Sequence, residues 1–221
     1  MFFVADAFSL DVQYGGRIEM CDEITSSSFL NDTWAGLASI AERGGVRIQD
    51  YDSTYLRNTT VDFSKNMRQW TWQYCTEFGY FQEPNEVYQT RSSALSIDYW
   101  LDFCHRVFDY SLLPPQSDFY NTYLYKGLNI TGENIFFFTA SEDPWQYAGM
   151  RKIHDPSHQS GMASYHISCD TCAHCVDLHA EREDDPMELK WGRYSAYHTI
   201  GKWLAEDLEK RQVSPNLSFL Q

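Results

Sequence analysis

The stretch HISCDTCAHCVDLH, residues 166–179, holds the densest group of chemically active side chains in the sequence. It contains three cysteines, three histidines and two aspartates in fourteen residues. Such a composition predicts a metal site, a disulfide-braced surface loop, or the setting of one histidine that transfers protons. The rest of the chain has to decide between these three interpretations.

A zinc site is the first interpretation, and its ligands would be Cys169, Cys172, Cys175, His174 and His179. A C-x2-C pair in a zinc protein usually has a second pair about 12–20 residues away, and the sequence has none. We therefore expect no metal and no cofactor. A local disulfide, joining Cys169 to either Cys172 or Cys175, fits an oxidising compartment better.

Asp143 is the residue that the chain offers as a partner to His174. It ends the run ENIFFFTASEDPW (133–145), which predicts a buried strand and a turn, and Pro144 restrains it to an extended conformation. Sites in open α/β sheets form beyond the carboxyl ends of strands. An aspartate after one strand and a histidine after the next is the order found in α/β-hydrolases. Asp143 is equally typical of a simple turn, so order alone leaves both interpretations open.

The chemistry of such a pair is that of acyl transfer. The carboxylate holds the imidazole in one tautomer and stabilises the imidazolium that forms. The imidazole takes the proton of a serine and later returns it to the leaving group.

The elements that position these residues follow from hydrophobic periodicity and from breaks. Helices are expected over 26–43, over 62–82 running into a packed loop, over 95–109 and over 184–211, and strands over 133–145 and 164–168. Pro114-Pro115 cannot continue a helix and indicates a boundary. The sequence thus predicts an α/β protein in which a mainly helical domain, residues 1–115, precedes a strand-containing segment, residues 116–221.

The charge of the chain narrows the classes of partner. A formal net charge of −14 disfavours nucleic acids and anionic membranes, and it suits an acidic compartment where part of the charge is neutralised. No apolar run reaches the roughly 18 residues that span a bilayer. The N-terminal MFFVADAFSL lacks the basic start and the long apolar stretch of a secretory signal.

Other features nevertheless indicate the secretory pathway, with a lysosome, a vacuole or the cell exterior as destination. The six cysteines are compatible with disulfides. Four N-x-[ST] glycosylation sequons occur, at Asn31, Asn58, Asn129 and Asn216. Secretory features without a signal lead us to expect that the chain is a fragment.

Several motifs occur in an order that resembles a known family. They are DVQYGGRIEMC (11–21), WTWQYCTEFGYFQ (70–82), NIFFFTASEDPW (134–145), AHCVDL (173–178) and DDPMELKWGR (184–193). Together they resemble the serine peptidase family of lysosomal Pro-Xaa carboxypeptidase, dipeptidyl peptidase II and thymus-specific serine protease. This resemblance implies the C-terminal part of an α/β-hydrolase core, preceded by a helical cap, and cleavage of peptides at a proline-related position.

The resemblance also implies roles for individual residues. Asp143 and His174 match the triad Asp and His, and Cys75 and Cys104 match a disulfide of the cap. Cys21 matches a cysteine whose partner lies upstream. The family's strand normally ends with Asn-Gly before the Asp-Pro-Trp turn, whereas this chain has Thr139-Ala140.

Aromatic residues near the cap motif are candidates for a substrate pocket. Their default role is core packing, but an aromatic wall also suits a proline ring. Under the family resemblance the pocket candidates are Trp72, Gln73, Glu77 and Phe78 of this motif, together with Trp145, two residues after Asp143.

The nucleophile is the main departure from the family. No G-x-S-x-G motif occurs, because none of the 12 glycines has a serine two residues later. We therefore expect this polypeptide alone to be catalytically silent and poorly soluble, and to need the N-terminal half of the hydrolase as a partner. The other expected partners are a peptide substrate and, for a homodimer, a second copy. The alternatives are a non-catalytic relative that binds peptides or a partner chain, and a small zinc protein.

Overall fold

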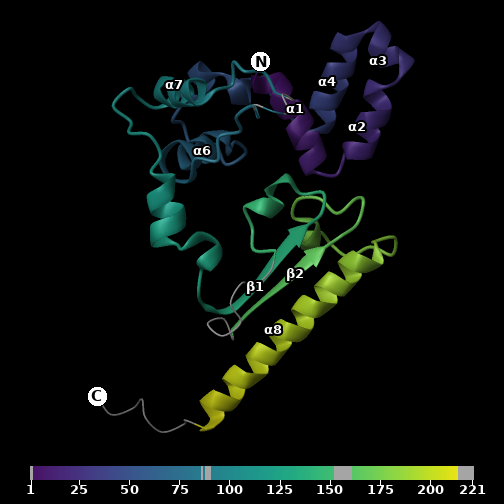
Figure 1. Ribbon diagram of the computed structural model, residues 1–221, viewed down its shortest axis with the longest axis vertical. Helices are drawn as coiled ribbons and strands as arrows, with labels where there is room; N and C mark the ends of the chain where they lie inside the picture. Colours follow the sequence, from purple (N-terminus) through teal and green to yellow (C-terminus); the bar gives the residue numbers. More distant parts are fainter. Residues whose placement is uncertain (1, 86, 88–90, 152–160, 214–221) are drawn as a thin grey trace. The chain divides into compact units, whose positions relative to one another are not determined.

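The computed structural model describes residues 2–85, 87, 91–151 and 161–213 (Figure 1). The chain divides into two compact units, Met1–Gly127 and Leu128–Gln221. The boundary expected after residue 115 falls inside the first unit, because the segment that follows it still packs there. In that segment the Asn121 side-chain amide donates a 3.0 Å hydrogen bond to the carbonyl oxygen of Phe78.

The first unit is built from helices and connecting segments in the part of it that is described, as expected for the helical half. Its α-helices are α1 (Phe2–Gln13), α2 (Arg17–Ile24), α3 (Ser27–Asn31), α4 (Thr33–Arg43), α5 (Ser53–Leu56), α6 (Met67–Gln73) and α7 (Ile97–Val107). Shorter helical turns are η1 (Ile48–Tyr51), η2 (Tyr74–Phe78) and η3 (Asp118–Leu124), and η4 (Gly127–Asn129) spans the boundary between the units. The helix expected over 62–82 is thus shorter, and it ends in the π-helical turn η2.

The helix expected over 26–43 is interrupted at Asp32. Ser26 caps α3, since its hydroxyl accepts a 3.2 Å hydrogen bond from the amide of Phe29. Asp32 then caps α4 by accepting a 3.0 Å hydrogen bond from the amide of Ala35. Asp is among the preferred N-cap residues because its carboxylate satisfies an amide that has no helical partner. The side chain of Asp32 therefore starts a new helix where the periodicity alone predicted one continuous helix.

The Asp32 cap leads to a stability prediction. We expect Asp32→Ala to lower the free energy of unfolding by about 1 kcal/mol, because an amide of the first turn of α4 loses its partner. The measurement is urea unfolding followed by circular dichroism. Glu42→Ala, which removes the same charge from the C-terminal part of α4, is the matched control. Equal losses in the two variants would contradict a capping role.

The main apolar cluster of the first unit surrounds a disulfide. Cys75 of η2 and Cys104 of α7 are joined, with their Cα atoms 5.7 Å apart, as the family resemblance implied. Both residues are buried in a cluster whose other buried members are Leu56, Tyr74, Trp100, Phe103 and Val107. The amphipathic helix α7 supplies most of this cluster from one face.

The second unit contains a parallel pair of strands and a long helix. β1 (Glu133–Ala140) pairs with β2 (Gly161–Ile167), with Ala140 opposite Ile167. The helix α8 (Met187–Val213) contacts both strands and runs along them in Figure 1. Short turns η5 (Pro144–Tyr147) and η6 (Val176–Leu178) complete the unit. Both strands and the closing helix agree with the predicted order of elements, and the strands belong to an α/β arrangement.

The start of α8 lies directly on β2. Leu189 is 1% exposed and belongs to a buried cluster with Ala140, Ile167 and Cys172. A Cβ atom added to Gly192 would lie 3.1 Å from Cγ1 of Ile167, so glycine at this position permits the close approach of helix and strand. This contact places the helix against the carboxyl end of the sheet, where the candidate site lies.

Candidate active site

The turn that follows β1 presents Asp143. The amide of Ser141 donates a 2.9 Å hydrogen bond to the Ile167 carbonyl at the end of β2, and the amide of Glu142 donates a 2.9 Å bond to the Cys172 carbonyl. Asp143 has the extended backbone (φ −78°, ψ 117°) that the following proline favours. The turn after β1 is therefore tied to the chain that follows β2.

The Asp143 carboxylate uses both oxygens. Oδ1 accepts a 2.8 Å hydrogen bond from the amide of Trp145, and Oδ2 lies 2.9 Å from Nδ1 of His174. Asp143 is 8% exposed, whereas the side chain of His174 is 30% exposed. Because an ionised carboxylate only accepts hydrogen bonds, the geometry assigns the proton of this contact to Nδ1. The histidine is thus oriented by a nearly buried carboxylate and retains access to solvent.

The segment between β2 and His174 is braced by a second disulfide. Cys169 and Cys172 are joined, which is one of the two pairings that the sequence left open. Cys172 is completely buried, and the hydroxyl of Ser141 donates a 2.9 Å hydrogen bond to the Cys169 carbonyl. Cys175 and Cys21 are free and exposed.

The disulfide removes the ligand set of the zinc interpretation. Cys169 and Cys172 would be two of its ligands, and their sulfurs are bonded to each other. Across residues 2–151 and 161–213, apart from 86 and 88–90, no group of three or more His, Cys, Asp or Glu side chains is placed to hold a metal ion.

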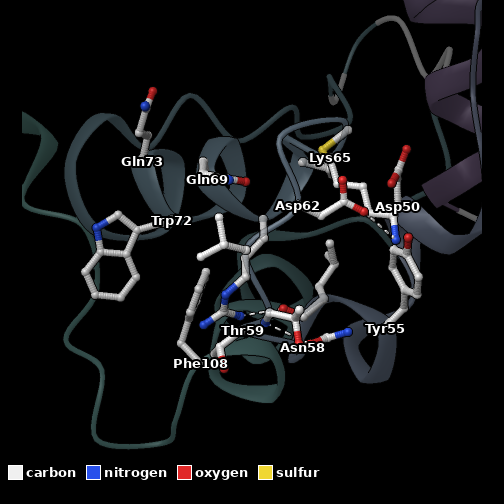
Figure 2. Close-up of a pocket in the computed structure, with 15 residues that line it drawn as sticks. Asp50, Tyr55, Asn58, Thr59, Asp62, Lys65, Gln69, Trp72, Gln73 and Phe108 are labelled. Atoms are coloured by element: carbon white, nitrogen blue, oxygen red, sulfur yellow. Dashed lines mark hydrogen bonds and ion pairs between the residues drawn. The ribbon is translucent and has the colours of Figure 1, made fainter.

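The substrate-pocket candidates do not all lie together. Trp72 and Gln73 line a pocket of about 480 Å³ in the first unit, whereas Glu77 and Phe78 are half-buried in η2 and are not among its lining residues. Figure 2 shows Trp72 on one side of this pocket and Tyr55 on the other. The remaining candidate, Trp145, belongs to the second unit and lies two residues after Asp143.

Among the pocket residues that sequence reasoning did not name are Arg68 and Phe108. Arg68 lies one turn before Trp72 on α6, and its guanidinium carbon is 4.7 Å from the ring centre of Phe108. Phe108 also meets Trp72 edge to face at 5.0 Å. The i,i+4 spacing of Arg68 and Trp72 is visible in the sequence. Phe108, at the end of α7, reaches this pocket only through tertiary packing, and the spacing of residues in the sequence does not indicate that contact.

The sequons were a further sequence expectation. Asn31, Asn58 and Asn129 are exposed, as an acceptor asparagine must be, and Asn216 lies outside the described residues. In the described residues, no helix is both long enough and apolar enough to cross a bilayer.

A second histidine, His166, belongs to β2 and lies one residue before its end. Nδ1 of His166 is 2.9 Å from Oγ1 of Thr139, its cross-strand neighbour, and Nε2 is 3.1 Å from a guanidinium nitrogen of Arg151. Since Arg151 can only donate, Nε2 accepts and the imidazole is neutral. Burial and the charge of Arg151 lower the pKa of His166.

The lowered pKa of His166 makes stability depend on pH. In the unfolded chain, His166 has a pKa of about 6.5 and binds a proton more readily than in the folded chain. The free energy of unfolding is therefore unaffected by this residue well above that pH, and it decreases as the pH falls below it. We expect the urea midpoint to drop between pH 7 and pH 5 by less in His166→Gln than in the parent chain. His198→Gln, at an exposed position on α8, is the control and should behave as the parent. An unchanged pH dependence in His166→Gln would contradict the assignment.

Known proteins resemble this chain over most of its length. A probable serine protease, EDA2 of Arabidopsis thaliana, is 30% identical over 80% of the chain, which covers 36% of that protein. The human thymus-specific serine protease is 28% identical over 62% of the chain and 26% of its own length. A probable extracellular serine carboxypeptidase of Arthroderma benhamiae is 27% identical over 47% of the chain and 14% of its own length. No solved structure matches.

The chain therefore spans about a third or less of these three relatives. The model of the family described as serine carboxypeptidase S28 matches residues 21–195, which include Asp143, His174 and both disulfides. Since this match covers well over half of the 221 residues, the chain belongs to the serine carboxypeptidase S28 family.

Proposed function

We propose that Asp143 and His174 are the Asp and His of a Ser-His-Asp peptidase whose nucleophilic serine lies outside these 221 residues. The observation that carries the proposal is the 2.9 Å contact between His174 Nδ1 and Asp143 Oδ2. The two side chains follow consecutive parallel strands, at the end of an α/β sheet where sites form. Under this proposal the second unit is the closing part of an α/β-hydrolase core.

The contact gives each residue a distinct task. Asp143 keeps the proton of His174 on Nδ1, so Nε2 is the basic nitrogen. Nε2 takes the serine proton as the serine oxygen attacks the peptide carbonyl, and it returns that proton to the leaving amine. Asp143 stabilises the imidazolium between these two steps. This chain thus supplies the proton transfer, and other residues supply the nucleophile and the oxyanion donors.

We further propose peptides with a proline-related cleavage position as substrates. Trp145 lies two residues after Asp143 and is half-buried, which supports a role for its indole as an apolar wall beside the substrate. A proline ring packs well on such a surface because it is apolar and rigid.

The disulfides and the exposed sequons support a secretory route that ends in a lysosome, a vacuole or outside the cell. The printed name of the Arthroderma relative, an extracellular serine carboxypeptidase, agrees with this proposal.

A non-catalytic relative that binds peptides is the second candidate. The observation in its favour is the lack of G-x-S-x-G within the 221 residues. In that case the Asp143–His174 pair would remain as a structural contact, and the aromatic pocket would be the functional part.

Reading the transcript upstream of Met1 and expressing the full reading frame separates these candidates. We expect a G-x-S-x-G serine, labelling of the product by a fluorophosphonate, and release of fluorophore from proline-containing peptides at acidic pH. His174→Ala should abolish both activities while the product remains folded. A reading frame that starts at Met1 and gives no labelling would favour the binding role. Labelling of the 221-residue chain itself would overturn the assignment of the serine to another segment.

A further inference from the structure

The loop that carries His174 is held from behind by one side chain of α8. Arg193 donates hydrogen bonds to three backbone carbonyls that follow the histidine. Nη2 lies 3.1 Å from the Val176 oxygen and 2.8 Å from the His179 oxygen, and Nε lies 3.3 Å from the Asp177 oxygen. Arg193 is only 7% exposed, so water hardly competes for these donors.

The remaining arm of the guanidinium is fixed by Asp185. Nη1 of Arg193 lies 2.5 Å from Oδ2 of Asp185, whose side chain is 5% exposed. The same oxygen accepts a 3.0 Å hydrogen bond from the amide of Arg182. The Arg182 amide and the Arg193 guanidinium lower the pKa of Asp185. The charged form of the Asp185 carboxylate is therefore favoured, and this carboxylate orients the guanidinium.

Because Arg193 belongs to α8, its side chain links the loop that carries His174 to the sheet. Gly192, the preceding residue, packs on Ile167 at the end of β2, and Leu189 is buried one turn earlier. Arg193 therefore starts from a position that cannot shift without disturbing the sheet. Its planar fork satisfies carbonyls in fixed directions, which an ammonium group cannot do.

His174 thus lies between two braces of different kinds. The Cys169–Cys172 disulfide fixes the chain before it, and the Arg193 guanidinium fixes the chain after it. A catalytic imidazole needs placement within a fraction of an ångström, and residues behind the site provide it. The disulfide restrains only the entry to the loop, so the exit depends on Arg193.

We propose that Arg193, oriented by Asp185, is a positioning residue that keeps His174 in its hydrogen bond with Asp143. The proposal rests on the function proposed above and deepens it. Without the guanidinium, the carbonyls of Val176, Asp177 and His179 lose their shared donor, and the loop has to open towards water to satisfy them. The Nδ1–Oδ2 contact is then made in only part of the molecules, while the strands and α8 stay in place.

Arg193→Lys in the full 221-residue chain tests the proposal. In the parent chain, ¹⁵N NMR is expected to show His174 as the Nδ1-protonated tautomer with a slowly exchanging proton. In the variant we expect a mixture of tautomers, and about tenfold faster hydrogen exchange at the amides of Val176 and Leu178. Arg211→Lys is the matched control, since Arg211 forms an exposed ion pair with Asp207 on the same helix. This control should match the parent.

The outcomes separate the two proposals. A parent chain without the Nδ1-protonated His174 would overturn the proposed function itself. The positioning role alone would be overturned if both the parent and Arg193→Lys show the Nδ1-protonated tautomer of His174 and exchange their amide hydrogens at the same rate. If Arg193→Lys does not fold, the same two measurements on Asp185→Asn test the proposal. This variant removes the carboxylate that orients the guanidinium of Arg193 but keeps the donors of that guanidinium.

Discussion

Asp143→Asn is expected to lower kcat/KM of the complete peptidase about 10⁴-fold, the loss known for the equivalent change in a serine protease triad. The asparagine amide can donate to Nδ1 of His174, which would move the imidazole proton to Nε2. An Nε2 that carries a proton cannot accept one from serine. The amide keeps the size of the carboxylate, and its oxygen can still accept the 2.8 Å hydrogen bond from the Trp145 amide, so the turn should survive.

The measurement is a steady-state assay on a proline-containing peptide, with fluorophosphonate labelling as a second readout. Asp170→Asn is the matched control, because it removes one charge from an exposed position in the segment that leads to His174. We expect the double variant Asp143→Asn with His174→Ala to be no slower than His174→Ala alone, since residues that act as one unit are not additive. A loss below about tenfold in Asp143→Asn would remove Asp143 from the triad.

Removal of the Cys75–Cys104 disulfide is expected to have the largest effect on stability. The bond closes a loop with a sequence separation of 29 residues, for which the chain-entropy model gives about 3–4 kcal/mol. Both cysteines are almost completely buried, so Cys75→Ala with Cys104→Ala also leaves space in the main apolar cluster of the first unit. The free energy of unfolding should therefore fall by at least this amount.

Urea unfolding by circular dichroism measures this change, and the second disulfide supplies the comparison. Cys169 and Cys172 are only three residues apart, and the same model gives roughly 1.5 kcal/mol for a loop of that length. The double alanine variant at Cys75 and Cys104 should thus lose about twice as much as the one at Cys169 and Cys172. Equal losses would show that loop closure is not the source of the stabilisation.

The candidate site was largely predictable because its two residues follow strands that are legible in the sequence. The apolar run before Asp143 and the short strand before His174 give the order of a hydrolase site, and Pro144 indicates the turn. The sequence could not settle the pairing of Cys169, because Cys172 and Cys175 both follow it closely in the same loop. The bracing by Arg193 was hidden as well, since its carbonyl partners carry no sequence signal.

The fold was predictable to a coarser degree. Periodicity found α7, α8 and both strands, yet it joined α3 and α4 into one helix. The local hydrogen bond of Asp32 prevailed over the apolar pattern that continues through it. The pocket beside Trp72 could not be predicted, because Phe108 contacts Trp72 from the end of another helix. The periodicity of one helix contains no information on such a contact.

The position of Cys175 has a consequence for the chemical lifetime of the protein. A free thiol so close to a disulfide in sequence is ordinarily a route to scrambling, because a thiolate attacks the disulfide sulfur and opens a new pairing. Desolvation of the sulfur by the surrounding atoms, with the charges of Asp177 and Asp143, raises the pKa of Cys175 and so disfavours the thiolate that exchange requires. The Asp143 carboxylate that orients His174 thus also slows disulfide exchange beside it.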